Sequence, residues 1–204
     1  MSPLETLGFA LGTSFASGLN LYATVAAVGL FERFGIVSLP EPLAMLAHPV
    51  VLGVAITLFL VEFVADKIPY VDSAWDAIHT FIRPPAAAIL SYSAFADSIP
   101  EEWKLAAALL AGGVALTSHG AKASTRAAAN ASPEPLSNWT LSLLEDGFAV
   151  FLAWMAAEHP LLTASIVVVL VILSVFVIWK LFGYLRRAIA RLRQGPGRPS
   201  PAEP

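Results

Sequence analysis

The stretch "VEFVADKIPYVDSAWDAIHTFIRPP", residues 61–85, decides how this chain folds, because it places many charges between apolar flanks. Its titratable side chains are Glu62, Asp66, Lys67, Asp72, Asp76, His79 and Arg83. The whole chain is 57% hydrophobic and only 13% charged, with a mean hydropathy of +0.71, whereas an ordinary soluble domain is about 25% charged. The composition therefore predicts an all-α membrane protein, in which charged side chains need partners.

Six segments are long enough to cross a membrane as helices, which requires roughly 20 mostly apolar residues. They are residues 6–31, 43–66, 72–95, 104–129, 136–157 and 161–185. The first, second and sixth are strongly apolar, and the other three contain polar or charged residues. We expect one transmembrane helical domain, residues 1–187. A cytoplasmic tail, residues 188–204, follows it; this tail is basic and then disordered, because it becomes rich in Pro and Gly.

The distribution of charge predicts the orientation of the chain. Arginines gather around the end of the sixth segment, at Arg186, Arg187, Arg191 and Arg193, and basic residues stay in the cytoplasm. Six crossings then place the N-terminus in the cytoplasm as well. The acidic connection "DSIPEEW", residues 97–103, falls on the outer side, which agrees with this orientation.

The third segment carries a polar stripe made of Asp72, Asp76, His79 and Arg83. At about 100° per residue these side chains fall within an arc of roughly 40–60° on one helix face. Pro84 and Pro85 follow directly; they lack a backbone N–H and disfavour helical geometry at the residue before them. We expect an amphipathic half-helix that breaks at Arg83–Pro85.

The fourth segment carries a basic stripe made of His119, Lys122, Arg126 and Asn130. Further acidic side chains lie on other segments, at Glu62, Asp66, Glu145 and Asp146. Unpaired charge at membrane depth costs several kcal/mol, so mutual pairing is the economical arrangement. We predict that Lys122 and Arg126 face the acidic residues of the other segments across the bundle, namely Glu62, Asp66, Asp72, Asp76 or Glu145.

The first segment indicates a close helix contact and a polar centre. Placing Gly18 on Gly120 aligns Asn20 with Lys122, and the two segments then cross in opposite directions, as in a three-plus-three inverted repeat. The candidates for lining a central cavity are Ser17, Gly18, Asn20 and Tyr22. The alternative is that the small residues of this segment serve helix packing alone.

Two chemical interpretations of the stripes stay open. Asp72, Asp76 and His79 could ligate a divalent metal, although D-x-x-x-D-x-x-H is not a specific signature. Alternatively, His79 and buried carboxylates could relay protons. The chain has no cysteine and no nucleotide-binding, nucleophile or zinc-protease motif. We therefore expect no cofactor and no binding of nucleic acid.

Three long stretches together resemble a known family: "SGLNLYATVAAVGL", residues 17–30, the opening stretch, and "HGAKASTRAAANASPEPLSNWTLSLLEDG", residues 119–147. The family consists of bacterial integral-membrane proteins catalogued as a domain of unknown function (DUF 4126-like). The resemblance extends over about residues 4–179. It implies a multi-pass protein of the bacterial inner membrane, and it implies no activity.

Three functions fit these features. The leading hypothesis is a small transporter or permease that moves a small polar or anionic solute, or a lipid headgroup, through the charged residues. The second is a metal-dependent membrane enzyme acting on a lipid phosphate. The third is a structural or regulatory protein whose charges only fix the helices. The expected partners are the lipid bilayer, the unknown ligand and a second copy of the chain in a homodimer.

Overall fold

The chain folds as an all-α protein. The computed structural model describes residues 1–95, 98–130 and 135–193, and no strand occurs in these ranges. The elements are α1 (Pro3–Leu19), α2 (Leu21–Arg33), the short 3-10 helix η1 (Glu41–Ala47), α3 (Pro49–Ala65), α4 (Pro69–His79), α5 (Arg83–Phe95), α6 (Glu101–Asn130), α7 (Pro135–Glu158) and α8 (Pro160–Arg193).

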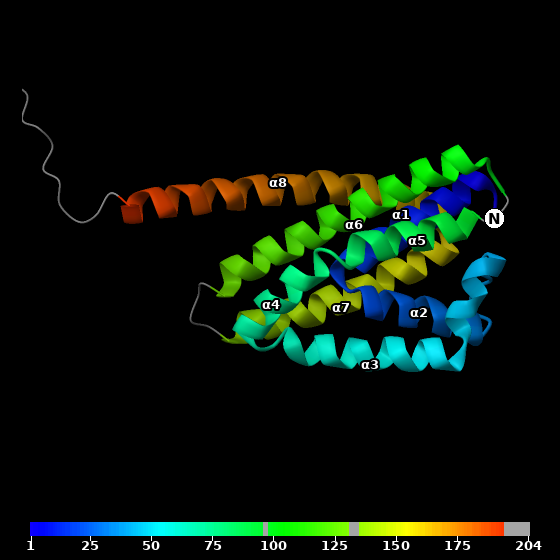
Figure 1. The fold of residues 1–204 in the computed structure, drawn as a ribbon, viewed down its shortest axis with the longest axis horizontal. Coiled ribbons are helices and arrows are strands. Elements are labelled where there is room, and N and C mark those ends of the chain that lie inside the picture. The colour runs from blue at the N-terminus through cyan, green and yellow to red at the C-terminus, as the bar shows by residue number, and fades with distance from the viewer. Residues whose placement is uncertain (96–97, 131–134, 194–204) are drawn as a thin grey trace, which may run out of the picture.

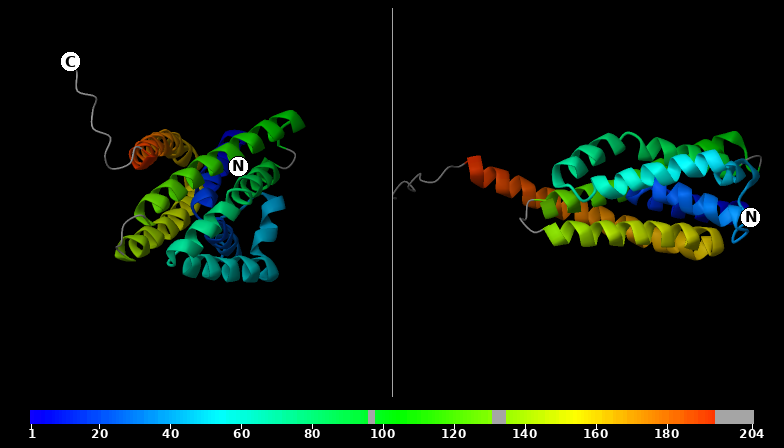
Figure 2. Two further views of the ribbon diagram at one scale, coloured as in Figure 1. Left: turned by 60° about the vertical axis from the view of Figure 1, so that its left-hand side comes forward. Right: turned by 90° about the horizontal axis from the view of Figure 1, so that it is seen from below.

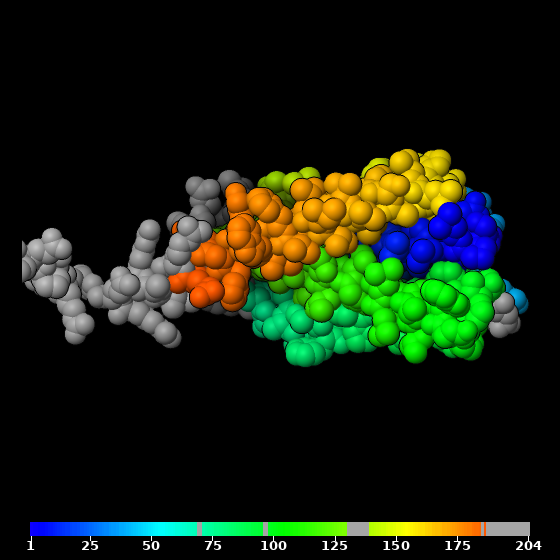
Figure 3. All heavy atoms as spheres, turned by 90° about the horizontal axis from the view of Figure 1, so that it is seen from above, coloured from blue at the N-terminus to red at the C-terminus, as the bar shows by residue number. Residues whose placement is uncertain are grey.

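The long helices run side by side along one axis, with α1 at the centre (Figures 1 and 2). α1 packs against α5, α6, α7 and α8, and almost every residue from Gly8 to Leu19 is buried. α8 lies alongside α6 on one face, where the N-terminal part of α1 emerges between them at one end (Figure 3). The first segment is therefore the core around which the other helices assemble.

Fewer helices are long and apolar enough to cross a membrane than the six segments predicted from the sequence. Two helical stretches of the described chain are long and apolar enough to cross a membrane, Trp139–Glu158 of α7 and Pro160–Tyr184 of α8. The pair η1 and α3, bent by 64°, makes a third if it is one span. The other helices do not pass this test: α1, α2, α4 and α5 are too short because helix breaks divide their segments, and α6 is long enough but too polar.

The first segment is two helices, whereas we expected one. Asn20 adopts an extended conformation (φ −150°, ψ 105°) between α1 and α2. Its backbone N–H still donates to the carbonyl of Ala16 at 2.9 Å. Its side-chain oxygen accepts from the N–H of Ala23 at 2.9 Å. Asn20 is thus the N-cap of α2, a position that Asn favours because its side chain replaces a missing backbone partner.

The break in the third segment lies three residues before the predicted position. α4 ends at His79 and Arg83 is already the first residue of α5. Pro84 and Pro85 sit in the first turn of α5, where no N–H donor is needed. Their rings would instead clash with the carbonyls four residues earlier in a continuous helix. The helix therefore breaks at residues 80–82, ahead of the prolines.

The starts of α3 and α8 and the end of α8 follow local sequence signals. His48–Pro49 and His159–Pro160 start α3 and α8, with proline in the first turn. α8 continues to Arg193, beyond the boundary at residue 187 that we expected, because Ala, Leu and Arg favour helix. The tail residues 194–204 lie outside the described residues.

Gly18 allows α1 and α6 to approach closely. A Cβ atom built on Gly18 would overlap the Ser118 side chain and the carbonyl of Ala115 on α6. In the existing contact, the Ser118 hydroxyl donates to the carbonyl of Phe15 at 3.0 Å. A Cβ atom built on Gly113, also on α6, would have nothing within 4 Å.

We predict that Gly18→Ala destabilises the protein by about 1–3 kcal/mol, because the added methyl group forces two helix backbones apart. Gly113→Ala should be neutral or stabilising by up to about 1 kcal/mol, since it adds helix propensity in open space. Thermal unfolding in detergent, followed by the loss of the monodisperse peak in gel filtration, measures both. Equal melting temperatures for the two variants would contradict the close contact.

Candidate functional site

The break between α1 and α2 leaves backbone carbonyls that the helix itself cannot satisfy. Arg83 Nη1 donates to the carbonyls of Gly18 at 2.7 Å and Leu19 at 3.0 Å. Lys122 Nζ also donates to the carbonyl of Leu19, at 3.0 Å. Two cations therefore meet the C-terminal end of α1, where the helix dipole is negative.

The same cations bind acidic side chains from several helices. We call this group the ion cluster; it consists of Glu62, Asp66, Asp72, Asp76, Arg83, Lys122, Arg126 and Glu145. All of its members except Glu145 are at most 5% exposed, and the side chain of Glu145 is 13% exposed. The cluster joins α3, α4, α5, α6 and α7 around the end of α1.

Arg83, the first residue of α5, forms a short and fully buried ion pair. Its Nη2 lies 2.6 Å from Glu62 Oε1, and both side chains are fully buried. Asp76 is a more distant partner, with Oδ1 at 3.9 Å from the same nitrogen. The stripe that we predicted thus includes an internal contact between its own members.

Lys122 and Arg126 of α6 pair with acidic residues of the predicted set. Lys122 Nζ lies 3.0 Å from Asp66 Oδ2 and 3.4 Å from Glu62 Oε1. Arg126 Nη2 lies 2.6 Å from Glu145 Oε2 and 3.1 Å from Asp66 Oδ2. Asp66 therefore bridges both cations, which fixes α6 against the end of α3.

Arg126 also reaches the start of α4. Its Nη1 lies 3.4 Å from Asp72 Oδ1 and donates to the carbonyl of Asp66 at 2.8 Å. Asp72 is fully buried. The acidic stripe of the third segment is therefore split: Asp72 faces Arg126, while Asp76 faces Arg83.

Hydrogen bonds hold both histidines of the predicted stripes, His119 and His79. Arg83 Nη1 lies 2.9 Å from His119 Nδ1, and because a guanidinium can only donate, this Nδ1 accepts. His119 Nε2–H then points at the carbonyl of Asp76, 3.0 Å away, and at the hydroxyl of Thr80, 2.9 Å away. His119 therefore supports the break between α4 and α5.

His79 faces the second helix and not the ion cluster. Its Nδ1 lies 2.8 Å from the carbonyl of Trp75 and must donate to it. Its Nε2 then accepts from the hydroxyl of Tyr22 at 3.1 Å. The ring also stacks on Trp75 at 4.6 Å between centroids. This arrangement leaves neither ring nitrogen of a neutral His79 free for a metal.

The proposed metal ligands Asp72, Asp76 and His79 are directed to three different partners. Within the described ranges, no group of three His, Asp or Glu side chains could hold a metal ion. The stripe extends over two helical turns, so its members lie at successive depths along α4 and cannot reach one point. The metal interpretation of the sequence is therefore not supported by the geometry.

Asp146 lies next to the cluster, at the junction of α1 and α2. Its Oδ1 accepts a hydrogen bond from Asn20 Nδ2 at 2.8 Å. Asn20 is fully buried and Asp146 is 6% exposed. Among the candidates for a cavity lining, Ser17 is buried, and Gly18 serves the contact with α6. The side chain of Asn130 lies outside the described residues.

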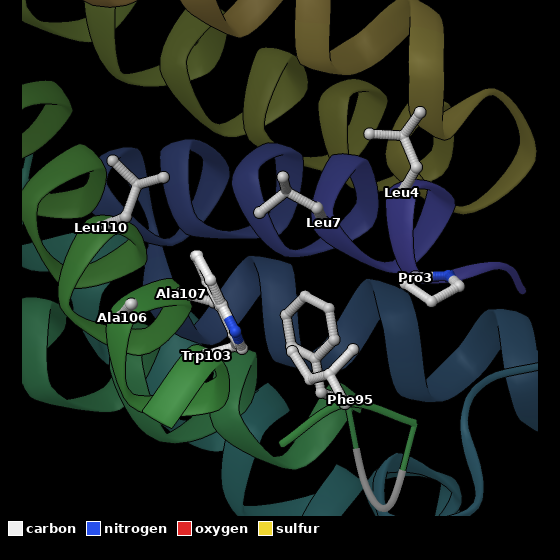
Figure 4. Close-up of a pocket in the computed structure, with 9 residues that line it drawn as sticks. Pro3, Leu4, Leu7, Phe95, Trp103, Ala106, Ala107 and Leu110 are labelled. Carbon is white, nitrogen blue, oxygen red and sulfur yellow. The ribbon is translucent and has the colours of Figure 1, made fainter. Parts of the chain in front are cut away.

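Two apolar cavities open on the surface of the bundle. One, of about 490 Å³, is lined by residues of α1, α5 and α6 that include Leu7, Phe95 and Trp103 (Figure 4). The other, of about 460 Å³, lies between α2, α3 and α5 and includes Tyr22. Tyr22, one of the residues predicted to line a cavity, therefore contacts both this apolar cavity and His79.

Sequence reasoning missed the backbone part of the site. The carbonyls of Gly18 and Leu19 hold two cations, and Thr80 holds His119. The tendency of Asn to cap helices was the available signal for the break at Asn20. No sequence pattern indicates which distant cation will bind a free carbonyl.

A family profile described as "Domain of unknown function (DUF4126)" matches residues 7–180. The chain belongs to this family. No curated protein and no solved structure matches the chain. The DUF4126 match includes every member of the ion cluster and both helix breaks, while residues 181–204 lie beyond it. The family description gives no activity, so the function must be argued from the geometry.

We predict that Arg126→Gln costs about 3–5 kcal/mol of stability, because Asp66, Asp72 and Glu145 lose a shared partner and stay buried. Lys180→Gln removes an exposed cation from α8 and should change the stability by less than about 0.5 kcal/mol. Thermal unfolding of both variants in the same detergent measures the difference. A tolerated Arg126→Gln would contradict the role of Arg126 in the cluster.

A charge reversal separates pairing from mere loss of a side chain. Arg126→Glu should prevent folding, whereas Arg126→Glu combined with Glu145→Arg should restore part of the folded yield, because the closest ion pair of Arg126 is rebuilt. The yield of monodisperse protein after extraction gives the readout. If the double variant yields no more than the single one, the pair does not act as a unit.

Proposed function

We propose that this protein is a small transporter or permease of the bacterial inner membrane, with the ion cluster as the central part of its path. The observation that carries the proposal is the meeting of two helix breaks and buried charge. The break at Asn20 and the break at residues 80–82 both supply groups that bind Arg83 or His119. Transporters place substrate and ion sites at broken helices of this kind.

The carboxylates of the cluster support this proposal over a purely structural network. Glu62 Oε2 and Asp66 Oδ1 are buried and have no hydrogen-bond partner in the described residues. A network that served stability alone would gain by satisfying these oxygens, since an unpaired buried acceptor costs about 1–3 kcal/mol. Free acceptors are what a site needs in order to bind a solute or a proton.

The charge balance narrows the class of solute. Lys122 and Arg126 are each shared among several carboxylates. Neither is therefore available to attract the anionic solute that the sequence analysis considered. Among the cluster atoms without a hydrogen-bond partner in the described residues, acceptors outnumber donors: Glu62 Oε2, Asp66 Oδ1 and Asp76 Oδ1 are acceptors, and Arg83 Nε is a donor. We therefore propose a small polar solute that offers hydrogen-bond donors, such as an amine or amide, in preference to an anionic one or a lipid headgroup.

The proposed architecture has six crossings with both termini in the cytoplasm. Besides α7, α8 and the pair η1 and α3, the crossings would be the pair α1 and α2, the pair α4 and α5, and α6. The partners would be the bilayer and a second copy of the chain. One contact supports the proposed inverted repeat. Gly18 packs beside Ser118, which lies two residues before Gly120, the residue aligned with Gly18 in the second half. The breaks of the first half have no counterpart in α6 or α8.

The topology can be tested cleanly because the chain contains no cysteine. We expect Ser98→Cys to react with a membrane-impermeant maleimide in intact cells, since Ser98 follows α5 on the proposed outer side. Ser2→Cys and Ala202→Cys should react only after the cells are opened. The unsubstituted chain is the control. Labelling of the Ser2 position in intact cells would contradict the proposed orientation.

Transport can be tested in proteoliposomes with an imposed pH gradient and a panel of amines, amides, sugars and organic anions. We expect uptake of a donor-bearing solute by the wild type and a loss of about tenfold or more in Glu62→Gln, because a buried charge pair is broken. Glu41→Gln is the matched control, since Glu41 is exposed in η1. A folded Glu62→Gln variant with unchanged uptake would contradict the proposed path.

A further inference from the structure

The region around the ion cluster holds more acidic than basic side chains. The acids are Glu62, Asp66, Asp72, Asp76, Glu145 and Asp146, and the bases among the cluster residues are Arg83, Lys122 and Arg126. Lys67 lies nearby but is only half-buried, and its Nζ binds the carbonyl of Phe63 at 2.8 Å and the hydroxyl of Ser142 at 3.4 Å. Uncompensated negative charge is costly away from water, so some of these acids need a bound proton or another cation.

Asp146 differs from the other five acids in its partners. Each of the other five has an Arg or Lys nitrogen within 3.9 Å. For Asp146, the described part of the chain contains no such ion pair. Its Oδ1 accepts from Asn20 Nδ2 at 2.8 Å, while its Oδ2 is buried and has no hydrogen-bond partner there. Asp146 is therefore the acid whose negative charge is least compensated.

We propose that Asp146 and Asn20 form a proton-binding site, in which Asp146 holds a proton on its carboxyl group in this conformation of the chain. The proton comes from water and occupies the free Oδ2, while Oδ1 keeps the bond from Asn20. The charged and titratable groups that face Asp146 are Glu62 and Asp66 of α3, Lys67 after α3, and Lys122 of α6. The two lysines favour an ionised Asp146 and the two acids disfavour it, so the proposal rests on the burial of a carboxyl group that has no ion pair in the described residues.

The geometry favours a proton over a metal ion at this site. A metal ion needs several oxygen or nitrogen ligands at one point, and the described side chains offer no such group of three. The backbone oxygens released at the helix break, those of Gly18 and Leu19, already bind Arg83 and Lys122. A proton needs only the one oxygen that is free.

The site is connected to the break in the first segment. Asn20 donates to Asp146 and caps α2 with the same side chain. When the proton leaves to water, the carboxylate of Asp146 attracts Lys122, which at present binds the carbonyl of Leu19 at 3.0 Å. A shift of Lys122 toward Asp146 removes one of the two donors to that carbonyl and leaves only Arg83 Nη1 at 3.0 Å, which loosens the end of α1. Proton release thereby weakens the contacts at the end of α1, the helix around which the other helices pack.

The role of this proton as the coupling ion rests on the proposed transport function, but the protonation of Asp146 does not. Infrared spectroscopy of the purified full chain in detergent tests the protonation directly. A protonated carboxylic acid has a C=O stretching band that carboxylates lack, and this band shifts in D2O. We expect the band in the wild type at neutral pH and its loss in Asp146→Asn. Glu158→Gln, which changes an exposed acid on the same helix, should keep it.

The outcomes are distinct. Asp146→Asn should fold as well as the wild type, because an amide matches a neutral acid in size and still accepts from Asn20. A variant that fails to fold, a wild type without the band, or a band that persists in Asp146→Asn would overturn the proposal. Addition of sodium chloride at constant pH should leave the band unchanged, and its disappearance would indicate a metal cation instead. If the wild type shows the infrared band but takes up no solute in proteoliposomes, the transport proposal is refuted and the proton-binding site is still supported.

Discussion

The backbone carbonyls of Gly18 and Leu19, released where α1 ends, connect the folded backbone to the buried charges. A broken helix in an apolar environment requires donors for its free carbonyls, and Arg83 and Lys122 supply them. Buried cations in turn require anions, which Glu62 and Asp66 supply. The break and the charges therefore stabilise each other, and neither would be tolerated alone.

This mutual dependence explains why so many helices converge on one region. α1 offers the carbonyls, α5 and α6 bring the cations, and α3 and α7 bring the acids. Gly18 allows α6 to lie close enough for Lys122 to reach Leu19. The excess of acid over base leaves one carboxyl, Asp146, without an ion pair in the described residues, beside the capping residue Asn20. A site with a free acceptor at a helix break can respond to a proton or to a polar solute.

Much of the helix pattern could be predicted from the sequence, because helix length, stripes and proline positions are local properties. α6 and α7 lie close to their predicted ranges, and both His-Pro pairs start helices. The breaks were harder to place. Proline signals a break but acts on the carbonyl four residues earlier, so the first helix of the third segment, α4, ends at His79 and not at Arg83. The first segment looked continuous because it has no proline and no charged residue near Asn20 to mark a break.

The sequence by itself determined that the chain is helical and apolar, and that its charges occupy narrow helix faces, because these features follow from composition and from the period of the helix. Only the tertiary structure decided which charges meet. Asp72 and Asp76 share a stripe, yet they bind Arg126 and Arg83 respectively, since each depth along α4 faces a different neighbour. Ion pairing is short-ranged in space and indifferent to distance along the chain, so the partners were fixed by the packing of α6 and α5 against the broken end of α1.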